Sequence, residues 1–281
     1  MSDSPMFSIV TVTWNAGDEI LRSLDSIYAQ TVDDFEVVIA DNDSDDDTVT
    51  LIRDAYGDEP TLTLLENDRN LGFSAGINRA IKRTEGDYIC CYNQDTLFPS
   101  DYLAELEKKV TQDAAWTTAR VNYRVSETHQ CIRFRTKYGY SIPYVVDSRS
   151  GCVETNFIPG DGAIIPRAIY NDVLKNMVFD PTLPARGEDV DLGLRLQEAD
   201  ITIKAILDTY SIHPDKLDLY ETRIVNFDDF LMNLYSNVVA YQRRNSASEW
   251  LPVLLGGFLL PFEVYFDQFP RPEKRLSEVK R

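Results

Sequence analysis

Cysteine is scarce in this sequence, and its four copies are not spaced for a shared function. Cys90 and Cys91 are neighbours in an apolar run, Cys131 and Cys152 stand alone, and no CxxC pair occurs. This spacing argues against a disulfide framework and against a zinc site. We expect buried free thiols in a reducing compartment.

Basic residues are outnumbered. The chain has 46 Asp and Glu against 28 Lys and Arg, a formal net charge of −18 at pH 7. Such a surface repels phosphates, so general binding of nucleic acid is disfavoured. The acid is mostly Asp and Arg exceeds Lys, a bias that suits a halophile, because concentrated salt screens self-repulsion. An acidic cytosolic protein from another source is the alternative.

An export signal and a membrane-spanning run are also missing. Residues 1–5 are polar and acidic, so we expect a cytoplasmic protein. The apolar run at 250–262 is too short to span a bilayer. Residues 250–266 could instead make a peripheral membrane contact at the inner membrane face. A buried helix or a homodimer contact is the alternative, and both remain open.

Strand and helix patterns alternate through the first half of the chain. The alternation over short connections predicts an α/β fold with a mostly parallel central sheet flanked by helices. In such sheets ligands bind beyond the carboxyl ends of the strands. We expect a catalytic domain at 1–225 and a helical, aromatic C-terminal extension at 226–281. The expected strands are 7–12, 35–40, 62–66 and 88–92, and the expected helices are 19–30, 48–56, 72–84 and 100–111.

Four segments in one order resemble the inverting family 2 glycosyltransferases with the GT-A fold, particularly the rhamnosyltransferase-like branch. They are VTVTWN at 10–15, IADNDSDD at 39–46, NLGFSAGIN at 70–78 with NQD at 93–95, and GDG at 160–162 with GEDVDL at 187–192. The resemblance covers about residues 7–215. It implies hexosyl or deoxyhexosyl transfer, with inversion, from a nucleotide-sugar donor to a hydroxyl of a glycan or lipid-linked acceptor, as in polysaccharide or glycoprotein glycan synthesis.

The donor site is expected around Asp41. This carboxylate ends a predicted strand at the ligand edge, where it can accept hydrogen bonds from a base or ribose, as its family counterpart does. Helix capping, with Ser44 as the N-cap, is accepted instead for Asp45, Asp46 and Asp47. The glycines at 160 and 162 would let backbone approach the donor sugar or acceptor, or simply form a turn. The resemblance adds these donor-binding residues: Thr11, Thr13, Asn15, Asn70, Gly72, Asn78, Asn93, Gly160 and Gly162.

A divalent metal is expected beside the donor diphosphate. Asn93-Gln94-Asp95 follows the fourth strand, where the family keeps an Asp-x-Asp metal motif. A diphosphate among so many carboxylates needs a hard cation, Mg²⁺ or Mn²⁺. Asp95 is the candidate ligand, although Asn and Asp also favour turns. Family enzymes often carry a metal- or phosphate-contacting His at the place of His213, but a lone His can equally be structural.

The catalytic base is expected at the start of the last helix. Inversion requires a base on the face of the sugar opposite the leaving diphosphate, to take the acceptor proton. Asp189 matches the family's base, and Glu188 is a helper or a carboxylate that stabilises the helix N-terminus. Asp191 is either a second helper or a carboxylate that stabilises the helix N-terminus.

Two other functions compete with glycosyl transfer. Nucleotidyl transfer usually shows a glycine-rich loop with Lys or Arg after the first strand, and residues 13–17 contain no basic side chain. A catalytically silent sugar-nucleotide-binding protein would not need the Glu188-Asp189 pair.

Overall fold

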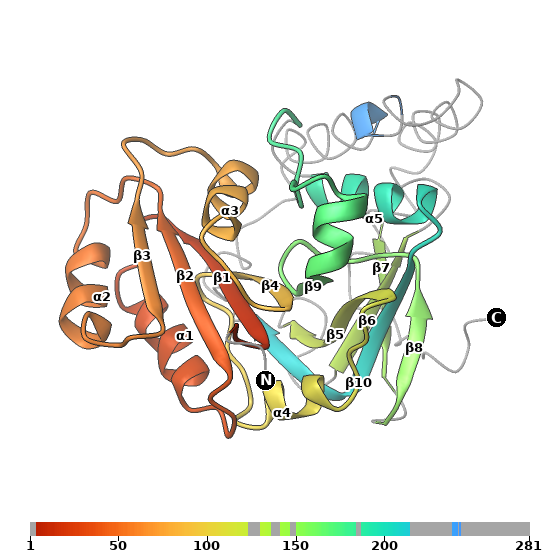
Figure 1. Cartoon of the computed structure of the whole chain (residues 1–281), viewed down its shortest axis with the longest axis horizontal. Coiled ribbons are helices and arrows are strands. Elements are labelled where there is room, and N and C mark those ends of the chain that lie inside the picture. The colour runs from red at the N-terminus through yellow and green to blue at the C-terminus, as the bar shows by residue number, and fades with distance from the viewer. Residues whose placement is uncertain are drawn as a thin grey trace, which may run out of the picture.

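The computed structural model describes residues 4–122, 130–135, 141–146, 150–183, 187–213, 238–240 and 242. In this part of the chain, every strand and helix predicted for the first half is present (Figure 1). The extension at 226–281 lies outside the described residues except for 238–240 and 242. The first four strands are β1 (Phe7–Thr13), β2 (Phe35–Asp41), β3 (Leu62–Glu66) and β4 (Tyr88–Asn93). The intervening and following helices are α1 (Asp18–Tyr28), α2 (Thr48–Tyr56), α3 (Phe73–Ile81) and α4 (Tyr102–Glu107).

The sheet is parallel in its first half and mixed in its second. Strands β3, β2, β1 and β4 lie side by side and parallel, as predicted. Beyond β4 the order is β9, β5, β10 and β8, and of these neighbours only β5 and β10 pair in parallel. The sheet is therefore mixed and less parallel than expected, because β9 lies between β4 and β5 and runs antiparallel to both, and β8 runs antiparallel to β10. These strands are β5 (Ala114–Asn122), β8 (Cys152–Thr155), β9 (Ala163–Pro166) and β10 (Thr202–His213), with β6 (Gln130–Arg135) and β7 (Ser141–Val145) forming a hairpin beside β5.

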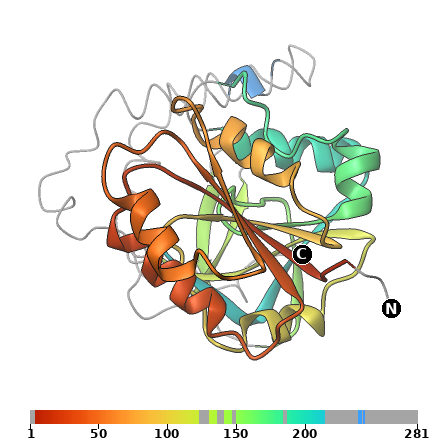
Figure 2. The ribbon, with the colours of Figure 1, turned by 60° about the vertical axis from the view of Figure 1, so that its left-hand side comes forward.

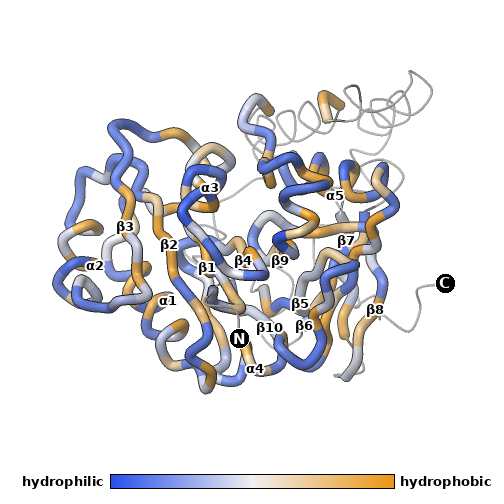
Figure 3. Tube along the Cα trace, viewed as in Figure 1, coloured by the Kyte–Doolittle hydropathy of each residue, from blue (hydrophilic) through white to orange (hydrophobic). Residues whose placement is uncertain are grey.

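Helices cover both faces of the sheet. Alternate residues of β1 point to opposite sides: Ile9 packs with Leu24 of α1, whereas Val10 packs with Ile77 of α3. Helix α5 (Glu188–Glu198) adds Leu192 to the α3 side. Figure 2 shows α1 and α2 on one side of the strands and α3 on the other, and Figure 3 shows hydrophobic residues along the central strands. Two buried faces explain the continuous apolar runs of these strands.

The cysteines are free thiols, as expected. Cys90, Cys91 and Cys131 are buried, but Cys152 is exposed, which the sequence did not indicate. Burial raises the pKa of the Cys90 and Cys91 thiols, so these two remain neutral. In the described part of the chain, no helix is both long enough and apolar enough to cross a membrane.

Candidate active site

Parallel pairing brings the carboxyl ends of β1, β2 and β4, which carry polar residues, to one edge of the sheet. Thr13 is in register with Asp41, and Val12 is in register with Asn93. Thr13 is buried, and its hydroxyl donates to Gln94 Oε1 at 3.1 Å. Thr11 is also buried, two residues before the edge. The edge is therefore built from the segments expected to bind the donor.

The Asp41 carboxylate organises the turn after β2. It is only 2% exposed and accepts from the Ser44 backbone at 3.0 Å and the Ser44 hydroxyl at 2.5 Å. Ser44 Oγ in turn accepts from the backbone N–H of Asn15 at 2.9 Å, and Asn15 Oδ1 accepts from the Asp45 N–H. Helix α2 begins at Thr48 after Asp47, so Ser44 is not its N-cap, contrary to expectation. The Ser44 side chain joins the β1 and β2 loops instead.

The start of α3 is held by a second set of amides. Asn42 Nδ2 donates to Asn70 Oδ1 at 3.3 Å and to the Gly72 carbonyl at 3.2 Å. The Gly72 N–H donates back to Asn70 Oδ1 at 2.8 Å, and its φ of 76° is one that glycine adopts without strain. Gly76 was not predicted as a functional position. A Cβ there would lie 2.6 Å from Val12 Cγ2, so only glycine lets α3 approach β1 this closely.

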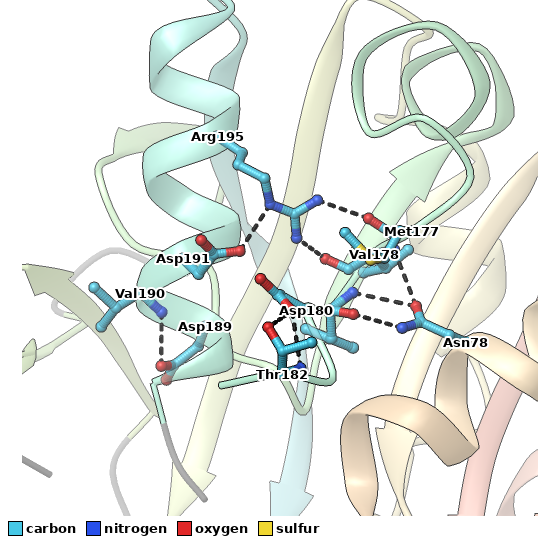
Figure 4. A network of polar contacts seen from close by, with 10 residues as sticks. Asn78, Met177, Val178, Asp180, Thr182, Asp189, Val190, Asp191 and Arg195 are labelled. Atoms are coloured by element: carbon cyan, nitrogen blue, oxygen red, sulfur yellow. Dashed lines mark hydrogen bonds and ion pairs between the residues drawn. The ribbon is translucent and has the colours of Figure 1, made fainter. Parts of the chain in front are cut away.

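Asn78 lies apart from this edge. Its amide donates to the Phe179 carbonyl and accepts from the backbone N–H groups of Val178 and Phe179 at 3.0 and 3.2 Å (Figure 4). The side chain is 8% exposed. These contacts tie α3 to the loop before α5, a structural position rather than the donor-facing one that the motif suggested.

The ends of β4 and β10 bring Asp95 and His213 together. Leu97 and Ile212 exchange backbone hydrogen bonds, which fixes the segment after β4 against β10. His213 Nε2 then lies 3.5 Å from Asp95 Oδ1 and 3.0 Å from Asn93 Nδ2. Asn93 and Asp95 from one motif and His213 from a distant segment thus lie within hydrogen-bonding or ion-pair range of one another.

Asp161 is the hub of this cluster. Its Oδ1 accepts from the Asn93 backbone at 3.0 Å and from Thr96 Oγ1 at 2.9 Å. Arg120 donates to its carbonyl at 3.2 Å and forms an ion pair with its carboxylate, which also lies 3.9 Å from His213 Nε2. The GDG motif at 160–162 contains Asp161, but the sequence indicated a role only for the two glycines. The signal that could have revealed it is a carboxylate held between two glycines.

The environment of Asp95 fits a bound cation. Burial raises the pKa of this carboxyl, His213 opposes that effect, and the nearby Asp161 carboxylate reinforces it. A carboxylate that is costly to ionise gains from a positive charge placed beside it. Among the described residues, no group of three or more His, Cys, Asp and Glu side chains is arranged to hold a metal. Asp95 and His213 therefore supply at most a pair of ligands, which suits an ion that takes its other ligands from phosphate and water.

The Glu188-Asp189 pair begins α5, as predicted. Gly187, with a φ of 103°, directs the chain into the helix. Asp189 Oδ1 accepts from the Val190 N–H at 2.8 Å. Burial raises the pKa of Asp189, while that hydrogen bond and the positive charges of Arg133 and Arg135 act in the opposite direction. A carboxylate with raised pKa is a stronger base, as proton abstraction requires.

Asp191 is a structural residue. It is fully buried and accepts from Arg195 Nε at 2.8 Å. The remaining guanidinium nitrogens of Arg195 donate to the carbonyls of Met177, at 2.7 Å, and Val178 (Figure 4). Asp191 lies in the first turn of α5, which agrees with the interpretation as a carboxylate that stabilises the helix N-terminus, and it also holds Arg195, whose guanidinium anchors the neighbouring loop.

The Gly160-Asp161 dipeptide joins the two halves of the site. A Cβ on Gly160 would lie 3.7 Å from Glu188 Cγ and 3.5 Å from Phe73 Cε1, whereas Asp161 contacts the cluster at the end of β4. Gly162 has a φ of 112°, and its N–H donates to the Cys91 carbonyl at 2.8 Å. Consecutive Cα atoms are about 3.8 Å apart, so the residue beside Glu188 and the residue that contacts Asn93 and His213 are direct neighbours.

Known proteins share sequence with this chain. The chain is 29% identical over 120 residues to chondroitin synthase of Escherichia coli, which covers 41% of this chain and 17% of that protein. It is 22% identical over 274 residues to the uncharacterized glycosyltransferase YfnE of Bacillus subtilis, covering 81% of this chain and 68% of that protein.

Solved structures share the fold. A mannosyltransferase from Pyrobaculum calidifontis, in complex with GDP-Man and Mn²⁺, superposes with a TM-score of 0.62 at 17% identity, covering 92% of this chain and 70% of that one. This neighbour establishes the GT-A glycosyltransferase fold predicted from the sequence. Residues 8–174, more than half of the chain, match the model of the family described as glycosyl transferase family 2. The chain belongs to this family.

Proposed function

We propose that the chain transfers a hexosyl or deoxyhexosyl group, with inversion, from a nucleotide-diphosphate donor to an acceptor hydroxyl. The observation that supports this proposal is the Gly160-Asp161 dipeptide, whose first residue lies beside Glu188 and whose second contacts Asn93 and His213. The rhamnosyltransferase-like branch remains part of the proposal, on the motifs alone.

The donor is proposed to lie along the carboxyl ends of β1 to β4. Asp41 and Asn15, joined through Ser44, would bind the nucleoside. Trp14 is 52% exposed beside them and offers a flat apolar surface to a base. Asn93 would bind near the diphosphate. Asn70 and Gly72 shape this edge by holding the start of α3.

Asp95 and His213 would hold a divalent ion, Mn²⁺ or Mg²⁺, together with the donor diphosphate. When bound, such an ion neutralises the diphosphate and stabilises its departure. Imidazole nitrogen is a better ligand for Mn²⁺ than for Mg²⁺, so the donor set favours Mn²⁺. The solved mannosyltransferase neighbour contains Mn²⁺ and GDP-Man, which supports this proposal.

Asp189 would act as the base. Its carboxylate would accept the proton of the acceptor hydroxyl as the oxygen attacks the anomeric carbon opposite the departing diphosphate. Glu188, beside Gly160, would orient the acceptor or the sugar. The test is a donor-dependent transfer assay with a panel of nucleotide sugars. Retention of anomeric configuration in the product would contradict the proposed role of Asp189.

The same assay distinguishes the competing functions. A catalytically silent binding protein would bind the donor and neither transfer nor hydrolyse it. A nucleotidyltransferase would form nucleotide sugar from a nucleoside triphosphate and a sugar phosphate. The positioned Glu188-Asp189 pair favours glycosyl transfer over both.

The acceptor is proposed to be a glycan or a lipid-linked sugar, with the protein cytoplasmic and peripheral at the inner membrane face. Residues 250–266, outside the described part, would make the membrane contact. Full-length protein should co-sediment with liposomes in high salt, and truncation after Asn245 should abolish this. Full-length protein that stays in the supernatant as a dimer would favour the homodimer contact.

A further inference from the structure

A cavity of about 560 Å³ opens beside the C-terminal half of α3. Its lining follows α3 from Ala75 to Arg83, just past the end of the helix, a rise of about 12 Å at 1.5 Å per residue, and it includes Leu65 near the end of β3. We call it the α3 groove, and its lining includes Leu65, Arg79, Lys82, Arg83, Met177 and Pro181.

The charge of the α3 groove is opposite to that of the protein. Arg79, Lys82 and Arg83 line it, and no carboxylate does so among the described residues. Within the same part of the chain, none of these three cations has an ion pair or hydrogen bond. Arg53, by contrast, pairs with Glu66, and the two other exposed arginines without an ion pair in the described residues, Arg22 and Arg69, do not line this cavity. Basic residues are favoured at the C-terminal end of a helix, which alone could explain their positions. It would not explain why they line a cavity that has no carboxylate in its lining among the described residues.

The groove also has an apolar lining that is held in place. Its apolar side chains include Leu65, Met177 and Pro181. The Met177 carbonyl accepts from Arg195 Nη1 at 2.7 Å, and Asn78, which also lines the groove, holds the next two residues. Figure 4 shows Asn78 and Arg195 approaching this loop from opposite sides. A wall held from two helices is preorganised, so binding there requires little ordering.

We propose that the α3 groove binds a phosphate group carried on an apolar chain. The phosphate would lie among Arg79, Lys82 and Arg83, because unpaired cations and apolar surface together match a lipid phosphate. The surplus of negative charge elsewhere on the protein disfavours a polyanion such as nucleic acid.

The groove also connects to the catalytic side of α3. Phe179 lies near Pro181 in sequence and packs against Phe73, with ring centroids 5.4 Å apart. Phe73 in turn approaches Gly160, next to Glu188. A phosphate-linked acceptor held in the groove could therefore extend its sugar along Phe73 to the Asp189 carboxylate. Only this identification of the ligand as the acceptor rests on the proposed function.

The test is calorimetric binding of three probes to the full chain: geranyl phosphate, inorganic phosphate and geraniol. Geranyl phosphate should bind most tightly, and Lys82→Ala with Arg83→Ala should weaken its binding about tenfold. The control is Arg22→Ala with Lys108→Ala, which changes the net charge equally outside the groove and should leave the affinity unchanged. Because these side chains are exposed, both double variants should fold, which circular dichroism can verify.

Three results would overturn the proposal: equal affinity in both double variants, displacement of geranyl phosphate by a nucleoside diphosphate with Mn²⁺, or inorganic phosphate binding as tightly as geranyl phosphate. The second would place the probe in the donor site, and the third would indicate a free phosphate ligand. Failure of every nucleoside diphosphate to bind would contradict the proposed function and leave the groove result standing.

Discussion

The carboxylate of Asp161 accepts a hydrogen bond from the backbone N–H of Asn93, a residue 68 positions earlier in the chain. The same carboxylate pairs with Arg120 in an environment where their side chains are 7% and 17% exposed. One side chain thus positions the segment that carries Asp95 and compensates a nearly buried cation.

Asp161→Asn should therefore destabilise the protein by about 2–4 kcal/mol, because it leaves the Arg120 charge uncompensated in a partly desolvated place. Urea unfolding followed by circular dichroism measures this. The control is Glu66→Gln, which removes an exposed ion pair with Arg53 and should cost less than about 1 kcal/mol. Equal losses in the two variants would show that burial of the Asp161 pair is unimportant.

Asp189→Asn should reduce turnover at least about a hundredfold with little change in donor affinity, because it removes the base and keeps the shape. Steady-state kinetics and donor titration separate the two effects. Asp191→Asn is the matched control on the same helix: it should lower the melting temperature through the loss of the Arg195 pair. If Asp189→Asn retains near-normal turnover, the base lies elsewhere.

The pH dependence of stability should follow from the raised pKa of Asp189. A carboxyl whose pKa is higher in the folded state binds more protons there than in the unfolded state. Its contribution to stability is therefore greatest at low pH and declines as pH rises from the ordinary aspartate pKa through the raised one. Asp189→Asn should remove this decline, so the variant should melt at a higher temperature than wild type at neutral pH. A lower melting temperature at neutral pH would mean that Asp189 is stabilised as a carboxylate.

Removal of divalent ions should weaken binding of a nucleoside diphosphate. The reason is the closeness of Asp95 and Asp161 to His213, which leaves an added diphosphate among carboxylates. Calorimetry with Mn²⁺ and with excess chelator tests this, and Asp95→Ala should abolish the difference between them. Equal affinity in chelator for the wild-type protein would exclude Asp95 as a metal ligand.

Gly76→Ala should destabilise the fold by about 1–3 kcal/mol, because the new methyl would overlap Val12. Gly193→Ala is the control in another helix: its Cβ would come no closer than 3.8 Å to a neighbour, so it should be neutral or stabilising. Thermal or urea unfolding of both variants provides the comparison. No loss of stability in Gly76→Ala would mean that α3 can move away from β1.

The sequence was most informative where structure is local. The period of the apolar residues predicted β1 to β4 and α1 to α4, and the rule for ligands at strand ends selected Asp41 and Asn93. The closeness of Asp95 to His213 depends instead on the pairing of Leu97 with Ile212. No periodicity encodes that pairing, and only the family resemblance suggested a shared role.

The roles of Asn78 and Asp161 were not predicted correctly, also because they depend on contacts between distant segments. Asn78 belongs to a motif that carries donor-site residues, yet helix α3 turns its side chain toward the loop at 178–179. The role of Asp161 could not be predicted because its partners lie on two strands, Asn93 on β4 and Arg120 on β5. These strands are brought to either side of Asp161 by the insertion of β9 between them. The order of strands beyond β4 could not be derived from the alternation of apolar residues, which is silent about which strand lies beside which.

The position of β9 between β4 and β5 also affects how the chain is made. While the protein leaves the ribosome, β1 to β4 can pair as soon as they emerge, but the outer edge of β4 must wait for residues 163–166. At about 5–20 residues per second, several seconds of synthesis separate the two strands. During that interval an apolar strand edge lies open to neighbouring nascent chains. Asp161 lies just before β9, so the step that covers this edge also brings Asp161 to Asn93.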